Sequence, residues 1–315
     1  MGGRACGLRS GPHCYDRKGC GRSEPHCIPV KAKLPSINQP PFAAAGELGP
    51  APVALMIVAQ FKSFLTRADR LEHGYTMAMR SLAVPTIEPL QQAGLGIARD
   101  IDGGVGAGVV AGYHNAQHFL EVMLSALYLA RLGALEAGRA ARVVTAGLVH
   151  DFHHDGSRGT TAPFRLEKLA VQEALPYLRK AGVPAAERGR LETLILATEP
   201  RSGVPFARAC WMHHCGSAAL PKFSAALPAP LERLLSDADL AQEAELLAEA
   251  DVLPSVGLTV QHAEQLQARL AAEWGTTLGR ADKLQFVERM VGDISAAAFF
   301  VPNMLALRDA YRHAG

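Results

Sequence analysis

The sequence has no excess of charge of either sign and no long hydrophobic run. It holds 32 Lys and Arg residues against 30 Asp and Glu residues, a formal net charge of +2. Proteins that bind nucleic acid or a membrane surface through charge usually carry a concentrated basic patch, so we expect neither as a partner. No apolar stretch approaches the roughly 18 to 20 residues that cross a bilayer, and we expect a soluble protein.

Cysteine is too sparse in most of the chain to supply a disulfide framework. Four of the six cysteines, Cys6, Cys14, Cys20 and Cys27, lie near the N-terminus. Their spacings of eight, six and seven residues contain no Cys-x-x-Cys pair, the pair that zinc sites commonly use. We therefore assign no metal or disulfide to this segment, whose role the sequence leaves open.

The chain divides into a tail and one domain. Residues 1–53 are rich in Gly, Pro, Arg and Ser and lack a sustained helical period, a composition typical of disorder. No apolar core follows the early basic residues, so we expect no secretory signal and a cytoplasmic location. Residues 54–315 are enough for one large folded domain. The sequence sets no oligomeric state.

Strand signals are almost absent, whereas helical periodicity is frequent. Alternating β-branched runs bounded by turn residues do not occur at useful length. Apolar residues instead recur every three or four positions, and we predict an all-α helical bundle. The expected helices cover residues 53–82, 114–135, 139–149, 164–181, 185–198, 231–250, 260–274 and 281–307, the last with a break at Pro302.

A glycine-rich stretch, GGVGAGVVAG at residues 103–112, superficially suggests a phosphate-binding loop. It lacks the Gly-Lys-Ser/Thr ending of such a loop and has no GxGxxG spacing. We interpret it as a flexible lead-in to the next helix.

Three short clusters carry residues suited to chemistry: YHNAQH at 113–118, HDFHHDG at 150–156 and DAD at 237–239. The first and last residues of HNAQH are histidines four apart, which lie on one face of a helix. The His-Asp pair of the second cluster ends an apolar helix, where it is costly to bury without a partner such as a divalent cation. Imidazole and carboxylate ligands together suit zinc, manganese or iron.

The order and spacing of these clusters resemble a known motif series. YHNxxH followed by HDxxHxG and an ADL triplet is similar to the class I cyclic-nucleotide phosphodiesterases of the HD superfamily. LATE at 196–199 resembles the family's LATD, and FVERMV at 286–291 resembles its FIExxV. The match extends over about residues 113–291, and it implies an HD-domain, phosphodiesterase-like helical bundle over the predicted domain.

The resemblance also implies roles for individual residues and two divalent metal ions. Zinc, manganese or iron is expected at a first, tightly held site, and magnesium or manganese at a second. The implied ligands of the first metal are His118, His150, Asp151 and Asp239, with Asp151 bridging to the second. His114 would be the general acid, His154 would hold water of the second metal, and Phe286 would form one wall of a clamp around the base. Asp237 remains a rival to Asp239.

Some positions depart from the family pattern. A glutamine that grips the purine edge in the family corresponds here to Lys283, and Gln285 lies two residues away. The middle motif reads His-His-Asp at 153–155 where the family has Asp-His-Pro. The family's glutamate on the following helix aligns clearly with neither Glu167 nor Glu173.

Three functions are compatible with these features. The first is a metal-dependent phosphodiesterase that hydrolyses 3',5'-cyclic nucleotides, such as cAMP, to 5'-nucleotides. The second is another HD phosphohydrolase, acting on a nucleotide monophosphate or a different small phosphoester. The third is a metal-bound scaffold without catalysis. His114 and His154 favour the diesterase, because the HD nucleotidases commonly need only the His…His-Asp…Asp core, while Lys283 points away from it.

Overall fold

The computed structural model describes residues 48–82, 88–157 and 162–313. Within these ranges the chain is helical and has no strand; one isolated bridge joins Gly108 and Asn115. The predicted all-α class is therefore confirmed. The predicted tail, residues 1–53, lies outside the described residues as far as residue 47. The first long helix of the described part begins at Pro50, within the last four residues of that predicted tail. No helix in the described ranges has the length and apolar character of a membrane span.

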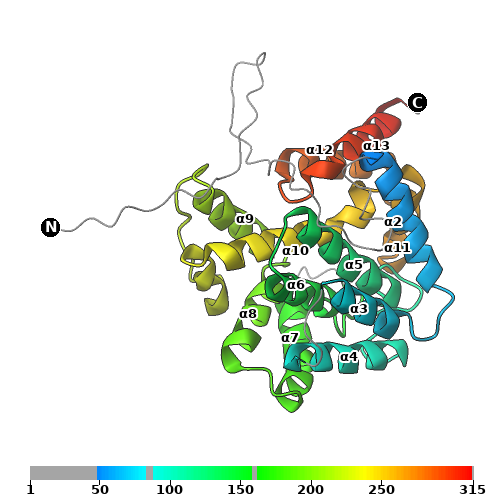
Figure 1. Ribbon diagram of the computed structural model, residues 1–315. Helices are drawn as coiled ribbons and strands as arrows, with labels where there is room; N and C mark the ends of the chain where they lie inside the picture. Colours follow the sequence, from blue (N-terminus) through cyan, green and yellow to red (C-terminus); the bar gives the residue numbers. More distant parts are fainter. Residues whose placement is uncertain (1–47, 83–87, 158–161, 314–315) are drawn as a thin grey trace.

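The helices follow one another along the chain in the order shown in Figure 1. They are α2 (Pro50–Phe64), α3 (Arg70–Ser81), α4 (Pro89–Asp102), α5 (Ala116–Leu132), α6 (Ala137–Val149), α7 (Arg165–Lys180), α8 (Ala185–Leu196), α9 (Gly203–His214), the 3-10 helix η1 (Ala229–Leu235), α10 (Ala238–Val256), α11 (Val260–Glu273), α12 (Arg280–Asp293), the 3-10 helix η2 (Ala298–Phe300) and α13 (Val301–His313).

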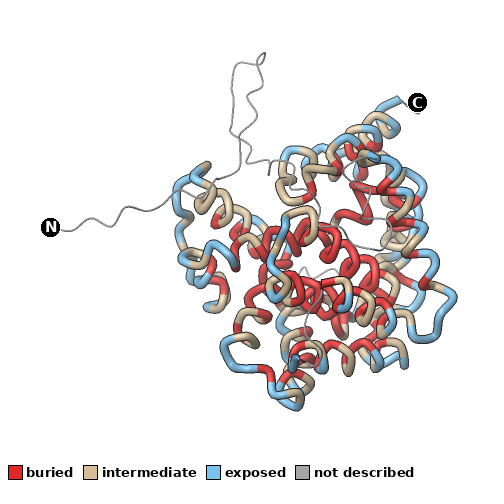
Figure 2. Tube along the Cα trace, viewed as in Figure 1, coloured by how far each residue is buried: buried red, intermediate tan, exposed pale blue. Residues whose placement is uncertain are grey.

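Three helices, α5, α6 and α10, pack against one another at the centre of the bundle. Their buried positions form the continuous red region of Figure 2. Every residue of α5 from His118 to Ala130 is buried, which marks it as a helix enclosed by its neighbours rather than an amphipathic surface helix. The helix α2 packs against α13, so the first and last helices lie side by side. The central helices can therefore hold polar side chains away from bulk water.

Two helices were not expected from the sequence. The helix α4 contains Gly94 and Gly96, which lowered its helical signal, yet the glycine at 94 has a packing role. A Cβ atom there would lie 2.3 Å from the Tyr75 ring. The helix α9 begins after Glu199, whose Oε2 accepts the amides of Ser202 and Gly203 at 2.6 and 3.1 Å.

Two expected helices are interrupted by carboxylates from distant parts of the chain. The helix expected over 53–82 is split, because the Asp102 carboxylate accepts the amides of Leu71 and Glu72 and so caps α3. The break expected at Pro302 lies earlier, at residues 294–297, where buried Glu249 accepts backbone amides. Pro302 instead lies in the first turn of α13, where proline fits a helix.

The glycine-rich stretch is a packed connection, unlike the flexible lead-in expected for it. Gly106 and Gly108 have φ angles of 63° and 68°, which glycine adopts without strain. The amide of His153 donates to Gly106 O at 3.1 Å, and that of Val109 donates to His114 O at 2.7 Å. This segment therefore ties His114, two residues before α5, to His153, four residues after α6.

We expect Gly108→Ala to destabilise the protein. A Cβ atom at this position would lie 2.0 Å from the His114 carbonyl oxygen, and a positive φ alone costs a residue with a side chain about 1 to 3 kcal/mol. Urea unfolding should show a loss of at least this size. Gly138→Ala is the matched control, because nothing lies within 4 Å of its added Cβ; equal stability of the two variants would contradict the prediction.

Candidate metal centre

Four side chains from the three central helices converge on one point. Nε2 of His118 lies 3.2 Å from Asp151 Oδ2 and 3.3 Å from Asp251 Oδ1. Nε2 of His150 lies 3.2 and 3.6 Å from the same two oxygens. We call these four residues the metal cluster. His118 is on α5, His150 and Asp151 follow α6, and Asp251 is near the end of α10.

The local structure directs the two imidazoles into this cluster. Asn115 caps α5, its Oδ1 accepting the amides of Gln117 and His118 at 2.8 and 3.1 Å, and so fixes the first turn that carries His118. Nδ1 of His150 is 3.0 Å from the carbonyl oxygen of Gly147. A ring that donates through Nδ1 leaves the lone pair of Nε2 free for a metal.

The chemistry of the donor set fits a divalent cation. Nε2 of His118 and Nε2 of His150 are buried, and although a carboxylate oxygen lies 3.2 Å from each, neither makes a hydrogen bond of suitable angle to a described residue. Ligand atoms of His118, His150 and Asp151 lie within 4.8 Å of one another. Two imidazole nitrogens and carboxylate oxygens at this separation suit zinc, manganese or iron, and a cation there would satisfy both ring nitrogens.

The charges of the cluster also favour a cation. Burial alone would lower the pKa of His118, but Asp151 and Asp251 outweigh it and raise that pKa to about 8. The same two carboxylates raise the pKa of His150 well above its usual value, again against burial. Burial would raise the pKa of Asp151 and Asp251, but the imidazoles hold both below the usual range. The carboxylates thus stay negative and attract positive charge, which a bound metal supplies while releasing protons.

The structure does not bring Asp239 to the metal cluster, so the sequence assignment of this ligand needs correction. Its side chain is 67% exposed and pairs with Arg139 at 2.8 Å. Its rival Asp237 caps α10 by accepting the amide of Leu240 at 3.0 Å. Asp251 lies 12 residues beyond Asp239, about 18 Å along a helix that rises 1.5 Å per residue.

The sequence contains a signal for Asp251 that motif comparison alone misses. Ala250-Asp251-Val252 repeats the Ala-Asp-apolar pattern of Ala238-Asp239-Leu240 on the same helix. Every residue of α10 from Glu243 to Ala250 is buried, and both aspartates lie four and seven residues from buried positions, so spacing along the helix does not separate them. The packed structure does, because Asp251 reaches His118 and His150.

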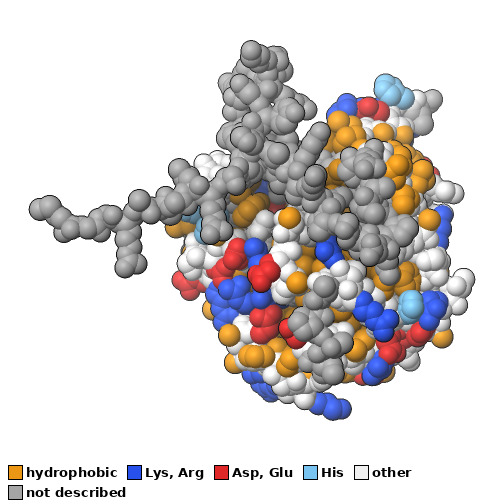
Figure 3. All heavy atoms as spheres, in the orientation of Figure 1, with side chains coloured by type: hydrophobic (Ala, Val, Ile, Leu, Met, Phe, Trp, Pro, Cys, Tyr) orange, Lys and Arg blue, Asp and Glu red, His pale blue; other side chains and the backbone are white. Residues whose placement is uncertain are grey.

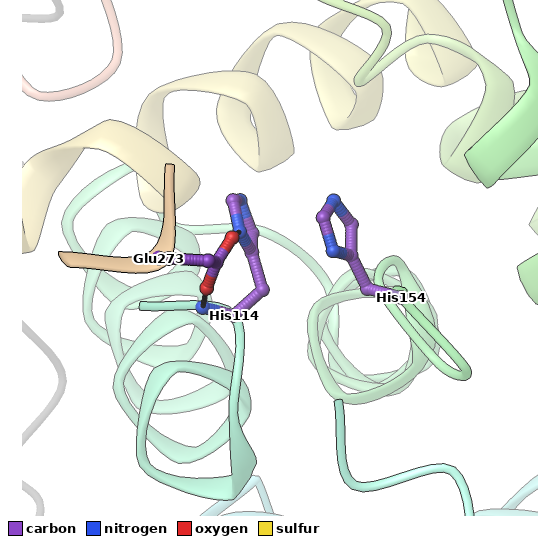
Figure 4. A group of neighbouring side chains, drawn as sticks. All are labelled: His114, His154 and Glu273. Carbon is purple, nitrogen blue, oxygen red and sulfur yellow. Dashed lines mark hydrogen bonds and ion pairs between the residues drawn. The ribbon is translucent and has the colours of Figure 1, made fainter. Parts of the chain in front are cut away.

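Glu273, the last residue of α11, fixes the ring of His114. Its Oε1 is 2.6 Å from His114 Nδ1, and its Oε2 accepts the amides of Tyr113 and His114 at 2.7 and 2.9 Å. Figure 4 shows His114 between this carboxylate and His154. Because Nδ1 is held by Glu273, Nε2 is the nitrogen of His114 left for a reacting group.

His154 lies against His114 and supplies a second imidazole. The two rings are stacked, with centroids 3.8 Å apart. Nδ1 of His154 accepts the amide of Gly156 at 3.0 Å, so the proton of the neutral ring is on Nε2. Burial lowers the pKa of His154 to about 4. The ring is therefore a neutral N–H donor at pH 7, as suits a residue that holds water.

His114, His154 and Glu273 also place ligand-type atoms within 4.8 Å of one another. The hydrogen bonds just described already occupy both oxygens of Glu273 and Nδ1 of each imidazole. Both Glu273 oxygens and both Nδ1 atoms thus have partners without a cation, and we interpret the group as one that orients His114.

Two hollows border the metal cluster. The smaller, about 160 Å³, is lined by His150, Asp151 and His154 together with Glu167, Thr198 and Glu199. Burial, with the negative charges of Asp151 and Glu199, raises the pKa of Glu167 to about 7. Of the two glutamates that sequence comparison left unaligned, Glu167 thus faces the cluster.

The larger hollow, about 390 Å³, is where the predicted clamp residue Phe286 lies. Trp274, Leu270 and other apolar side chains line it, and His114 and Asp251 border both hollows. Phe286 is half-buried. Its contact with a base remains a prediction.

No protein-family model and no curated protein matches this sequence. Solved structures match it in fold. The phosphodiesterase domain of the RhoPDE fusion protein from the choanoflagellate Salpingoeca rosetta has a TM-score of 0.53 and 13% identity, over 83% of this chain and 89% of that one. LmjPDEB1 in complex with IBMX has a TM-score of 0.53 and 12% identity, over 82% and 85%. This chain has a phosphodiesterase fold.

The fold likeness confirms the phosphodiesterase-like helical bundle that the motifs indicated. In this phosphodiesterase fold the metal cluster lies where α5, α6 and α10 meet.

The two aspartates of α10 give a direct test of the metal cluster. We expect Asp251→Asn to reduce bound zinc or manganese tenfold or more, because it removes a charged ligand-type oxygen, whereas Asp239→Asn should leave metal content unchanged. Metal analysis of the purified proteins, with circular dichroism to verify folding, makes the comparison. Metal loss in the Asp239 variant alone would restore the sequence assignment.

Proposed function

We propose that this chain is a metal-dependent phosphodiesterase that hydrolyses 3',5'-cyclic nucleotides to 5'-nucleotides. The observation that carries the proposal is a held imidazole next to the metal cluster. The ring centroids of His114 and His118 are 5.5 Å apart, and Glu273 fixes the orientation of His114. A metal-bound scaffold has no use for such a residue.

The assignment of metals follows the donor set. His118, His150, Asp151 and Asp251 would hold a first ion, zinc, manganese or iron, and Asp151 would share a second, magnesium or manganese. Such ions supply a hydroxide at neutral pH and withdraw charge from phosphoryl oxygens. Asp251 replaces Asp239 in this ligand set.

His114 could supply the proton that an alkoxide leaving group needs. When the bond to phosphorus breaks, the alkoxide leaving group must gain a proton, and a placed general acid contributes about 10² to 10⁴ in rate. Glu273 holds Nδ1 of His114, so Nε2 is the atom that delivers this proton. The N–H of His154 holds water beside it.

The hollow that Phe286 lines is suited to a small ligand. Its volume of about 390 Å³ is within the range of ligand pockets. The face in Figure 3 carries Lys and Arg side chains interspersed with Asp and Glu, without a continuous basic stripe among the atoms drawn in colour. This supports a small phosphoester as the substrate rather than a nucleic acid. Lys283, in place of the family's glutamine, favours the second candidate, a different HD phosphohydrolase.

A substrate panel separates these candidates. The metal-loaded protein should hydrolyse 3',5'-cyclic nucleotides and a generic bis-aryl phosphodiester, and should leave nucleoside 5'-monophosphates intact. Product formation is followed by chromatography with manganese, magnesium or zinc added. Cleavage of the monophosphates alone would select the second candidate, and no cleavage with any of these metals would contradict both.

The leaving group tests the role of His114. His114→Ala should lower the turnover of a cyclic nucleotide about 10² to 10⁴ fold, while metal content stays that of the wild type. The loss should be much smaller for a bis-aryl diester, because an aryl oxide leaves without needing a proton. An equal loss on both substrates would show that His114 is not the proton donor.

A further inference from the structure

Lys283 is a buried cation in the larger hollow. The residue is 6% exposed, and its Nζ donates to the carbonyl oxygen of Ser255 at 2.8 Å. Among the described residues this is its one hydrogen-bond partner. An ammonium group has three donors and no acceptor, so two donors remain for an occupant of the hollow. Burial lowers the pKa of Lys283 to about 8, and the charged form still predominates at pH 7.

The partner of Lys283 connects it to the metal cluster. Ser255 follows Asp251 by four residues on α10, about 6 Å along the helix. Lys283, Asp251 and His114 all line the same hollow. An occupant whose phosphate is at the metal cluster would therefore extend its other end toward Lys283.

The walls of the hollow suit a flat aromatic group. Phe286, Trp274 and Leu270 line it with Leu266 and Leu278, so the faces of a ring would meet apolar surface. Nζ of Lys283 and the guanidinium of Arg289 each lie over the Phe286 ring, 5.6 Å from its centre. A flat ring that enters the hollow beside these side chains would present its polar edge near the ammonium. A nucleobase has this combination of apolar faces and a polar edge.

We propose that Lys283 selects the base, favouring guanine over adenine. Guanine presents two neighbouring acceptors, O6 and N7, whereas adenine replaces the first with an amino donor. A donor-only ammonium matches the guanine edge and opposes the adenine amino group. Gln285, which has both a donor and an acceptor, is exposed and does not line the hollow. This inference rests on the proposed function, because it assumes a nucleotide in the site.

Equilibrium binding of 5'-GMP and 5'-AMP to the full, metal-loaded chain tests the inference without requiring turnover. The wild type should bind 5'-GMP at least about tenfold more tightly than 5'-AMP. In Lys283→Gln the ratio should fall to near one, because an amide can serve either edge. Lys283→Arg keeps donors only and should keep the preference. Gln285→Met on the same helix is the matched control and should leave the ratio unchanged.

Each alternative outcome is decisive. Equal binding of the two nucleotides by the wild type, binding of neither, or a guanine preference that survives in Lys283→Gln would overturn the inference. The inference would also be overturned if the ratio of 5'-GMP to 5'-AMP affinity fell to near one in the folded Gln285→Met variant. If 5'-GMP preference depends on Lys283 but no cyclic nucleotide is hydrolysed, base selection stands and the proposed diesterase activity is wrong.

Discussion

The structure depends on two buried imidazoles and two partly buried carboxylates that meet and need positive charge between them. Charged side chains are costly to bury unless they are paired or bind a metal, and here the pairs are drawn from α5, the end of α6 and α10. His118 and Asp251 are 133 residues apart in sequence. The cluster therefore exists only when these three helices are packed, and metal affinity and bundle stability should be linked.

The sequence was informative where a motif is local. His118 follows a capped helix start, and His150 and Asp151 are adjacent at the end of an apolar helix, so local sequence was enough to predict where each lies on its helix. A triplet match cannot decide between Asp239 and Asp251 as the second acidic residue of the metal cluster, because the same pattern occurs twice on α10. The spacing of buried residues cannot decide either, because α10 is buried on all sides from Glu243 to Ala250, so the choice depends on how α10 packs against α5 and α6.

The ends of helices were difficult to predict from sequence because they too depend on contacts with distant residues. The breaks before α3 and after α12 are set by Asp102 and Glu249, carboxylates that accept amides from residues 30 or more positions away. Glycines were also misleading, since Gly94 and Gly108 meet requirements of packing and backbone conformation that only the folded chain reveals. The prediction of an all-α class was correct despite these errors, because it rests on helical periodicity in many segments of the sequence.

Under the proposed function, catalysis and substrate choice would use different parts of this fold but share α10. Asp251 would hold metal beside α5 and α6, while the Ser255 carbonyl, one turn further, accepts from the lysine that α12 contributes. Because a helix is rigid over one turn, the distance between these two anchors is fixed. Replacing a side chain on α12 can then change which ring edge is accepted without moving the metal cluster, so a phosphodiesterase fold can keep one chemistry and change its base.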